Sequence, residues 1–170
     1  METKKLELLL DGDLSYFDEF YQETKQKVFY NIYSILKDTS LSEDALQETY
    51  IKFLKNRENL KKDQNIIGYL FVISRNISLD IIKKRKKETE LSDYELVNAH
   101  EEKSPYVDDV MEKMKKILKD QEFQIVIMHL VNDMTHKEIA KLLNKPLGTI
   151  TWAYNNAIKK IRKGMRINEG

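Results

Sequence analysis

Residues 134–163 read MTHKEIAKLLNKPLGTITWAYNNAIKKIRK, and this stretch decides the fold. Thr135 and Glu138 form a capping box, in which each side chain bonds the backbone amide of the other residue at a helix start. A short helix is predicted to end where Asn144 suits the left-handed conformation found at helix ends. Pro146 starts a second, longer helix, since proline is favoured at the first helical position. This layout is typical of a helix-turn-helix.

The second helix of this motif has an apolar face and a polar face. The inward stripe consists of Ile150, Tyr154, Ala157 and Ile161. The outward set consists of Thr149, Thr151, Trp152, Asn155, Asn156 and Lys159. Asparagine can bond an adenine edge and threonine can touch a thymine methyl, while nearby cations can neutralise phosphates. Those cations are Lys137, Lys145, Lys160, Arg162 and Lys163. An ordinary helical hairpin with a polar outer face is the structural alternative.

Composition excludes several other classes of protein. The chain has 170 residues and no cysteine, which excludes disulfide scaffolds, thiolate zinc sites and cysteine nucleophiles. Five glycines and two prolines disfavour a β-sandwich and a glycine-rich phosphate loop. No apolar run could span a bilayer, and the charged start is unlike a secretory signal. His100, His129 and His136 lack partners at metal-ligand spacing. We expect a cytoplasmic, non-enzymatic, all-α protein without membrane insertion, metal or cofactor.

Charge divides the chain into three blocks. Residues 1–87 hold 16 basic and 14 acidic residues, and residues 110–170 hold 12 basic and 6 acidic residues. Residues 88–109 hold eight acidic residues and one basic residue, with few large apolar side chains. We therefore predict two small helical domains, 1–87 and 110–170, joined by a flexible acidic linker over 88–109. Basic tracts in both domains suggest two contacts with a polyanion, although one such tract alone can be a solvated helix end.

Apolar residues at helical spacing place the remaining elements. In the first domain we predict a helix over Asp13–Lys37, a second helix opened by a Ser40–Glu43 capping box, a loop over Asn56–Asn65 and a long helix over Ile66–Lys87. In the second domain we predict helices over Tyr106–Leu118, after Pro105, and over Gln121–Val131, with Asp120 as its cap.

Three segments resemble one protein family. The opening stretch is similar to the promoter-reading end of bacterial sigma factors of the extracytoplasmic-function (ECF) type, in the sigma-70 family. The family features in it are Glu138-Ile139-Ala140, Gly148-Thr149-Ile150 and Ala157-Ile158-Lys159-Lys160. SEDALQETYIKFLKN, residues 42–56, resembles the helix that docks on the polymerase clamp. GYLFVISRNISLDIIKKRKK, residues 68–87, resembles the helix that meets the downstream promoter element. The matches come in family order and cover about residues 13–166.

The resemblance implies a sigma factor that binds core RNA polymerase and promoter DNA. Its partners would be the clamp of the largest subunit, the flap of the second largest subunit, and an anti-sigma factor, which family members often have. Residues implied in polymerase binding are Asp44, Gln47 and Glu48, which share one helix face. Residues implied at the −10 element are Arg75, Asn76, Lys83, Lys84 and Arg85. Residues implied at the −35 element are Lys137, Lys145, Thr149, Thr151, Trp152, Asn155, Asn156, Lys159, Lys160 and Lys163. The loop over 56–65 would capture an unstacked base.

Departures from the family pattern leave alternatives open. Many relatives carry Lys or Arg where this chain has Thr151, Ala153 and Asn156, so −35 reading could be altered, weakened or tuned to A·T-rich DNA. One alternative is a sigma-like adaptor that docks on polymerase without reading promoters. Another is a DNA-binding regulator that uses the helix-turn-helix alone. Tyr69, Phe71 and Ile73 fit core positions better than base-stacking roles.

Overall fold

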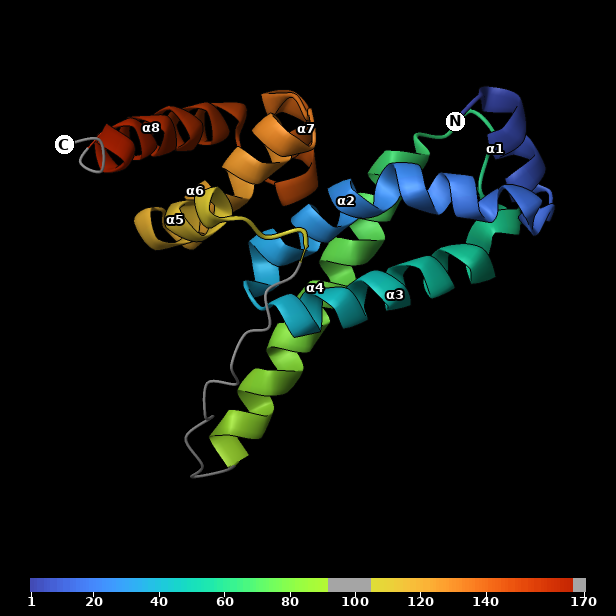
Figure 1. The fold of residues 1–170 in the computed structure, drawn as a ribbon, viewed down its shortest axis with the longest axis horizontal. Coiled ribbons are helices and arrows are strands. Elements are labelled where there is room, and N and C mark those ends of the chain that lie inside the picture. The colour runs from blue at the N-terminus through green and yellow to red at the C-terminus, as the bar shows by residue number, and fades with distance from the viewer. Residues whose placement is uncertain (92–104, 167–170) are drawn as a thin grey trace.

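The computed structural model describes residues 1–91 and 105–166, and all regular structure in these ranges is helical (Figure 1). The predicted all-α fold is therefore confirmed. The N-terminal helices are α1 (Thr3–Leu10), α2 (Phe17–Leu36), α3 (Thr39–Asn56) and α4 (Ile66–Leu91), with short turns η1 (Leu14–Tyr16) and η2 (Arg57–Asn59). The C-terminal helices are α5 (Asp109–Ile117), α6 (Asp120–Val126), α7 (His136–Leu143) and α8 (Leu147–Arg166), with a π-helical turn η3 (Ile127–Val131).

The N-terminal half is a bundle in which α2, α3 and α4 pack on one another. Phe53 of α3 stacks on a ring of α2 and is fully buried. Asn31, buried on α2, donates to the Phe71 carbonyl oxygen at 3.2 Å and to the Ser74 hydroxyl at 2.9 Å, both on α4. Phe71 and Ile73 lie in the core as predicted. Because the buried side-chain amide of Asn31 has both hydrogen-bond partners on α4, it fixes the register of α2 against α4.

The start of α3 differs from the sequence prediction. Lys37 takes a left-handed conformation, with φ at 55°, which ends α2. Asp38 then lies extended and caps α3, because its carboxylate accepts from the Leu41 amide at 2.9 Å. The predicted capping box at Ser40 is wrong, since Ser40 already lies inside the first turn of the helix. Aspartate and serine both favour the N-cap position. Because α2 ends at Leu36 and Lys37 turns the chain, Asp38 and not Ser40 stands at the start of α3.

Helix α4 continues beyond its predicted end at Lys87 and reaches Leu91. Its exposed second half projects from the bundle in Figure 1. Part of the predicted linker over 88–109 is thus helical, and residues 92–104 lie outside the described residues. The next helix begins at Asp109, not at Tyr106, because the Asp108 carboxylate caps it through the Met111 amide at 2.8 Å.

The predicted helix over Gln121–Val131 is formed, but its last five residues are wound as a π-helix and not as an α-helix. It is not capped by Asp120, because α6 begins at Asp120 and Lys119 stands at the N-cap, where its amide donates to the side chain of Glu122 at 3.0 Å. After Val126 the chain widens into the π-helical turn, where the Asn132 amide donates to the Ile127 carbonyl oxygen at 3.1 Å. The wider turn leads the chain into the helix-turn-helix formed by α7 and α8.

Helix α8 is held by the other C-terminal helices. Ile150 and Ala157 on its inner face are fully buried. Near its end, a Cβ on Gly164 would lie 2.6 Å from Cδ1 of Ile117, so a larger residue there would require the Ile117 side chain of α5 to shift. No helix in the described ranges is both long enough and apolar enough to cross a membrane.

The two halves touch each other through α2, which the sequence did not predict. Helix α2 packs against α6 and η3, and buried apolar residues form one continuous cluster through both halves. Phe29 contacts the ring of Tyr106 at a centroid distance of 4.7 Å, and Tyr33 contacts Phe123 at 6.3 Å. Ion pairs join Lys27 to Asp133 at 2.8 Å and Lys37 to Asp120. The halves are therefore closed on each other in this structure.

Candidate DNA-binding and docking surfaces

The caps of the helix-turn-helix are formed as predicted. The Thr135 amide donates to the Glu138 carboxylate at 2.8 Å, and the Glu138 amide donates to the Thr135 hydroxyl at 3.2 Å. The hydrogen bonds from Thr135, first from its amide and then from its hydroxyl, lower the pKa of Glu138. Asn144 ends α7 in the left-handed conformation, with φ at 51°. These caps fix α7 and the turn that presents the start of α8.

The outer face of α8 is exposed and lacks carboxylates. Trp152 is 69% exposed. The other exposed residues among those predicted for −35 DNA are Lys137, Lys145, Thr149, Asn155, Lys159 and Lys163. Thr151 is half-buried, and its hydroxyl lies 3.2 Å from Nδ1 of His136. The outward face predicted from the sequence therefore exists around Trp152 and Asn155.

Asn156, which was predicted to point outward, and Lys160, which was predicted as a phosphate contact, are half-buried and bond a carboxylate of α6 instead. Asn156 donates to Oε1 of Glu122 at 2.6 Å, and Lys160 donates to both carboxylate oxygens at 2.7 and 2.8 Å. Burial acts to raise the pKa of Glu122, but hydrogen bonds from Lys160, the Lys119 amide and Asn156 outweigh it and lower the pKa. The sequence offered no signal for this contact, because Glu122 fits the polar first turn of an ordinary helix.

Three aromatic side chains meet behind the start of α8. The rings of His129, His136 and Tyr154 lie with centroids 4.6 to 4.9 Å apart. Nδ1 of His129 lies 2.7 Å from the Met134 carbonyl oxygen. Burial, and then the neighbouring His129, lower the pKa of His136. Within the described residues, no three His, Cys, Asp or Glu side chains gather as metal ligands.

The residues predicted for −10 DNA lie along α4. Asn76 is exposed and Arg75 is half-buried in its first half. Lys83, Lys84 and Arg85 are exposed on the projecting half, where Arg85 lies 4.0 Å from Asp38. The two groups lie about two turns apart on one helix.

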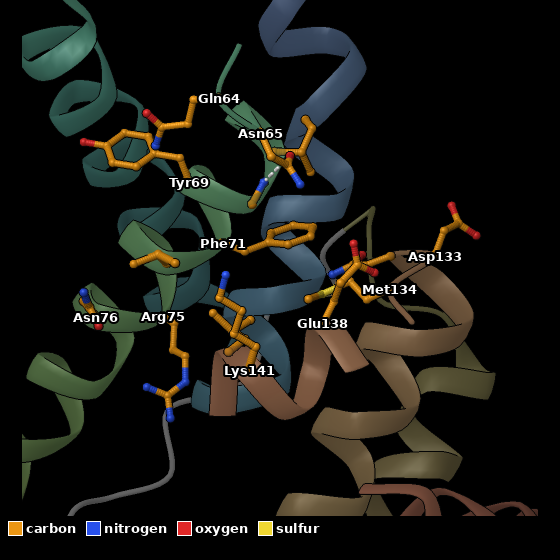
Figure 2. A pocket seen from close by; sticks show the side chains of 15 residues that line it. Gln64, Asn65, Tyr69, Phe71, Arg75, Asn76, Asp133, Met134, Glu138 and Lys141 are labelled. Carbon is orange, nitrogen blue, oxygen red and sulfur yellow. Dashed lines mark hydrogen bonds between the residues drawn. The ribbon is translucent and has the colours of Figure 1, made fainter. Parts of the chain in front are cut away.

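A cavity of about 790 Å³ separates α4 from the helix-turn-helix (Figure 2). Arg75 and Asn76 of α4 line one side, and Lys141 of α7 lines the other. Asn65 closes the end, where its side-chain Oδ1 accepts from the Gly68 amide at 2.9 Å. The cavity thus lies between the predicted −10 residues of α4 and helix α7 of the helix-turn-helix, and none of the residues predicted for −35 DNA is among those that line it.

The predicted polymerase-binding face is an exposed side of α3. Asp44, Gln47 and Glu48 are exposed, while intervening residues of the same helix are buried in the bundle. Ile51 was missed, although its spacing from Gln47 and Glu48 places it on the same face. It is 52% exposed and adds an apolar side chain at the C-terminal end of this acidic face.

Comparisons with known proteins agree with this architecture. Residues 20–88 match sigma-70 region 2, and residues 109–161 match sigma-70 region 4. The chain is 24% identical to the ECF RNA polymerase sigma factor SigW of Bacillus subtilis, over 98% of this chain and 97% of the relative. It is 27% identical to SigM of the same organism, over 75% of this chain and 81% of the relative.

Two solved structures share the fold. One is the sigma factor RpoE of Bartonella quintana, crystallised with the anti-sigma factor NepR, with a TM-score of 0.71 and 19% identity over 89% of this chain and 97% of that one. The other is CnrH in complex with the cytosolic domain of CnrY, with a TM-score of 0.66 and 12% identity over 97% of both chains. With both region matches and relatives along its length, the chain belongs to the ECF sigma factors of the sigma-70 family, non-enzymatic proteins that bind core RNA polymerase and direct promoter recognition and transcription initiation.

Proposed function

We propose that four contacts of the chain divide the work of initiation. Helix α4, with the loop over 56–65, engages the −10 element, and α8 reads the −35 element. The α3 face of Asp44, Gln47 and Glu48 docks on the clamp of the largest polymerase subunit, and the C-terminal half meets the flap of the second largest. The domain division is 1–87 and 110–170, with the acidic linker over 88–109 between them. The observation that carries this proposal is the exposed, carboxylate-free outer face of α8.

Phosphate contacts and base contacts come from different parts of the basic surfaces. Lys83 and Lys84 on α4, with Lys145 and Lys163 around α8, supply attraction that does not depend on sequence. Asn155 and Thr149 supply groups that suit A·T pairs. Because the first turns of α8 carry no cation, we infer that its discrimination rests on hydrogen bonds and on the Trp152 ring.

Binding to both elements requires the closed halves to separate. Arg75 and Lys141 line the same cavity. The −10 and −35 elements are named for their positions on the promoter, so they lie about 25 base pairs apart, which is about 85 Å along the duplex. Because α4 and the helix-turn-helix border one cavity, they lie much closer together than that span. We infer that the contacts of α2 with α6 and η3 open when the chain joins polymerase and DNA. The closed form is then the resting state of the free protein.

An anti-sigma factor and a cytoplasmic location complete the proposal. The two solved relatives are in complex with protein partners, one of them named as an anti-sigma factor. We infer that this chain also has an anti-sigma partner, which stabilises a state unable to engage polymerase. A cytoplasmic location would place the protein with core polymerase and DNA.

Run-off transcription with core RNA polymerase and the full chain tests the proposal. A specific transcript that appears only with the chain is the expected result. Stable docking on core enzyme without such a transcript would favour the adaptor alternative, for which the uncharged start of α8 is the motivating observation. Failure of the full chain to capture core enzyme, with retained binding to DNA, would favour a regulator that uses the helix-turn-helix alone.

A further inference from the structure

Glu122 is a buried carboxylate to which the surfaces described above assign no task. Its side chain is 7% exposed and lies on α6, against the inner side of α8. It accepts hydrogen bonds from Lys160 at 2.7 and 2.8 Å, from Asn156 at 2.6 Å, and from the Lys119 amide at 3.0 Å. Four hydrogen bonds from three donor groups satisfy this buried carboxylate, which would otherwise be costly to remove from water.

The two α8 donors determine how the helix is rotated about its axis. Asn156 and Lys160 are four residues apart and therefore lie on one face of the helix. When both bond one carboxylate on α6, α8 cannot roll without breaking these contacts. Each residue along a helix turns by about 100°, so a roll of that size would replace the exposed Asn155 and Lys159 by their neighbours.

We propose that Glu122 is a positioning residue for promoter recognition: it holds α8 at one rotation and withdraws Asn156 and Lys160 from the DNA-facing surface. Base reading then falls to Trp152, Asn155 and Thr149, and phosphate binding in this part of α8 falls to Lys159. This inference rests on the proposed reading of the −35 element by α8. Asn156 and Lys160, which the sequence predicted as DNA contacts, then serve to hold α8 against α6.

The pair Lys159 and Lys160 provides a matched test of the charge assignment. The promoter affinity of the holoenzyme is measured against salt concentration for Lys159→Gln and Lys160→Gln. Removing a phosphate contact lowers the slope of log affinity against log salt by about 0.9. We expect that loss for Lys159→Gln, while Lys160→Gln keeps the slope of the unsubstituted protein. An equal loss of slope for Lys160→Gln would show that Lys160 binds phosphate and would overturn the inference.

Charge exchange tests the positioning role itself. The readout is discrimination, the ratio of holoenzyme affinities for a promoter and for the same fragment with a scrambled −35 element. We expect Glu122→Lys and Lys160→Glu each to lower discrimination about tenfold, the size of one misread base pair. The double variant Glu122→Lys, Lys160→Glu should recover it, because the ion pair is rebuilt with its charges reversed. Were Lys160 a DNA contact, a glutamate at that position would repel phosphate in both backgrounds, and no recovery would occur.

Folding and the parent proposal are controlled separately. Glu122→Gln keeps the shape of the side chain, and circular dichroism checks that each variant is folded before it is scored. If the single charge variants do not fold, Glu122→Gln replaces them, and unchanged discrimination in that variant overturns the inference. If the unsubstituted holoenzyme does not discriminate at the −35 element, the proposed reading by α8 fails, and the inference fails with it. Discrimination by that holoenzyme without recovery in the folded double variant overturns the inference alone.

Discussion

Replacing Tyr33 with phenylalanine should make the chain bind core RNA polymerase more tightly. The Tyr33 hydroxyl, on α2, donates to the Glu112 carboxylate of α5 at 2.7 Å and thereby links the two halves. Phenylalanine keeps the buried ring and loses this link. The closed state should be weakened while the N-terminal core remains packed.

The size of the effect follows from the surroundings of Glu112. A hydrogen bond to a charged group contributes about 1.5–3 kcal/mol. Glu112 is 35% exposed at its side chain and keeps Lys115 at 3.8 Å, so water and this lysine compensate for part of the loss. The low end of the range, about 1.5 kcal/mol, applies and corresponds to roughly tenfold. If only the opened form binds polymerase, apparent affinity rises in proportion to its population.

Fluorescence titration of the labelled chain with core enzyme measures this affinity. Tyr30→Phe is the control, because the Tyr30 hydroxyl accepts from Gln26 at 3.2 Å within α2 and has no hydrogen bond to the C-terminal half among residues 105–166. We expect roughly tenfold tighter binding for Tyr33→Phe and no change for Tyr30→Phe. Since the chain has no cysteine, a Lys52→Cys, Lys116→Cys pair reports the separation of the halves directly. Equal affinities and equal label distances in the two phenylalanine variants would refute the closed resting state.

Three further predictions concern polymerase docking, DNA binding and the pH dependence of stability. Gln47→Ala with Glu48→Ala should impair co-purification with core enzyme without changing the thermal midpoint, and unchanged co-purification would contradict the clamp assignment. Asn155→Ala should weaken binding to one promoter sequence selectively, whereas Lys83→Ala should lower binding across sequences; competition binding on several promoters distinguishes a selective loss from a uniform one. Because its pKa is lowered from 6.5, His136 should make the free energy of unfolding fall as pH drops below about 6.5 and level off below the lowered pKa. Urea titrations across this range should show a smaller fall for His136→Gln, and equal falls in both proteins would exclude this cause.

Local patterns in the sequence were sufficient for the helix-turn-helix. The Thr135–Glu138 box and the left-handed Asn144 depend on neighbours within a few residues, so they could be predicted without tertiary information. The competition between Asp38 and Ser40 could not, because it depended on where α2 stopped. The extension of α4 was also missed: an acidic composition indicated a linker, but Lys and Glu are good helix formers, and no glycine or proline interrupts residues 88–91.

Contacts between distant segments account for the remaining misses. Phe29 and Tyr33 lie within the predicted helix over Asp13–Lys37, but periodicity does not tell which partner covers an apolar face. Glu122 lies 34 and 38 residues from its two α8 partners. A carboxylate near a helix start normally reads as a solvated charge, so its burial against α8 appears only once the helices are packed.

Site-specific photo-crosslinking in one promoter complex tests the central claim most directly. A crosslinking residue is placed at Asn76 on α4 or at Trp152 on α8, and the linked bases are mapped after assembly with core enzyme on promoter DNA. We predict that Asn76 reaches the −10 element and Trp152 reaches the −35 element of the same promoter, although α4 and the helix-turn-helix adjoin one cavity in the free protein. Crosslinks from both positions to one short stretch of DNA, or from neither, would contradict two separated promoter contacts.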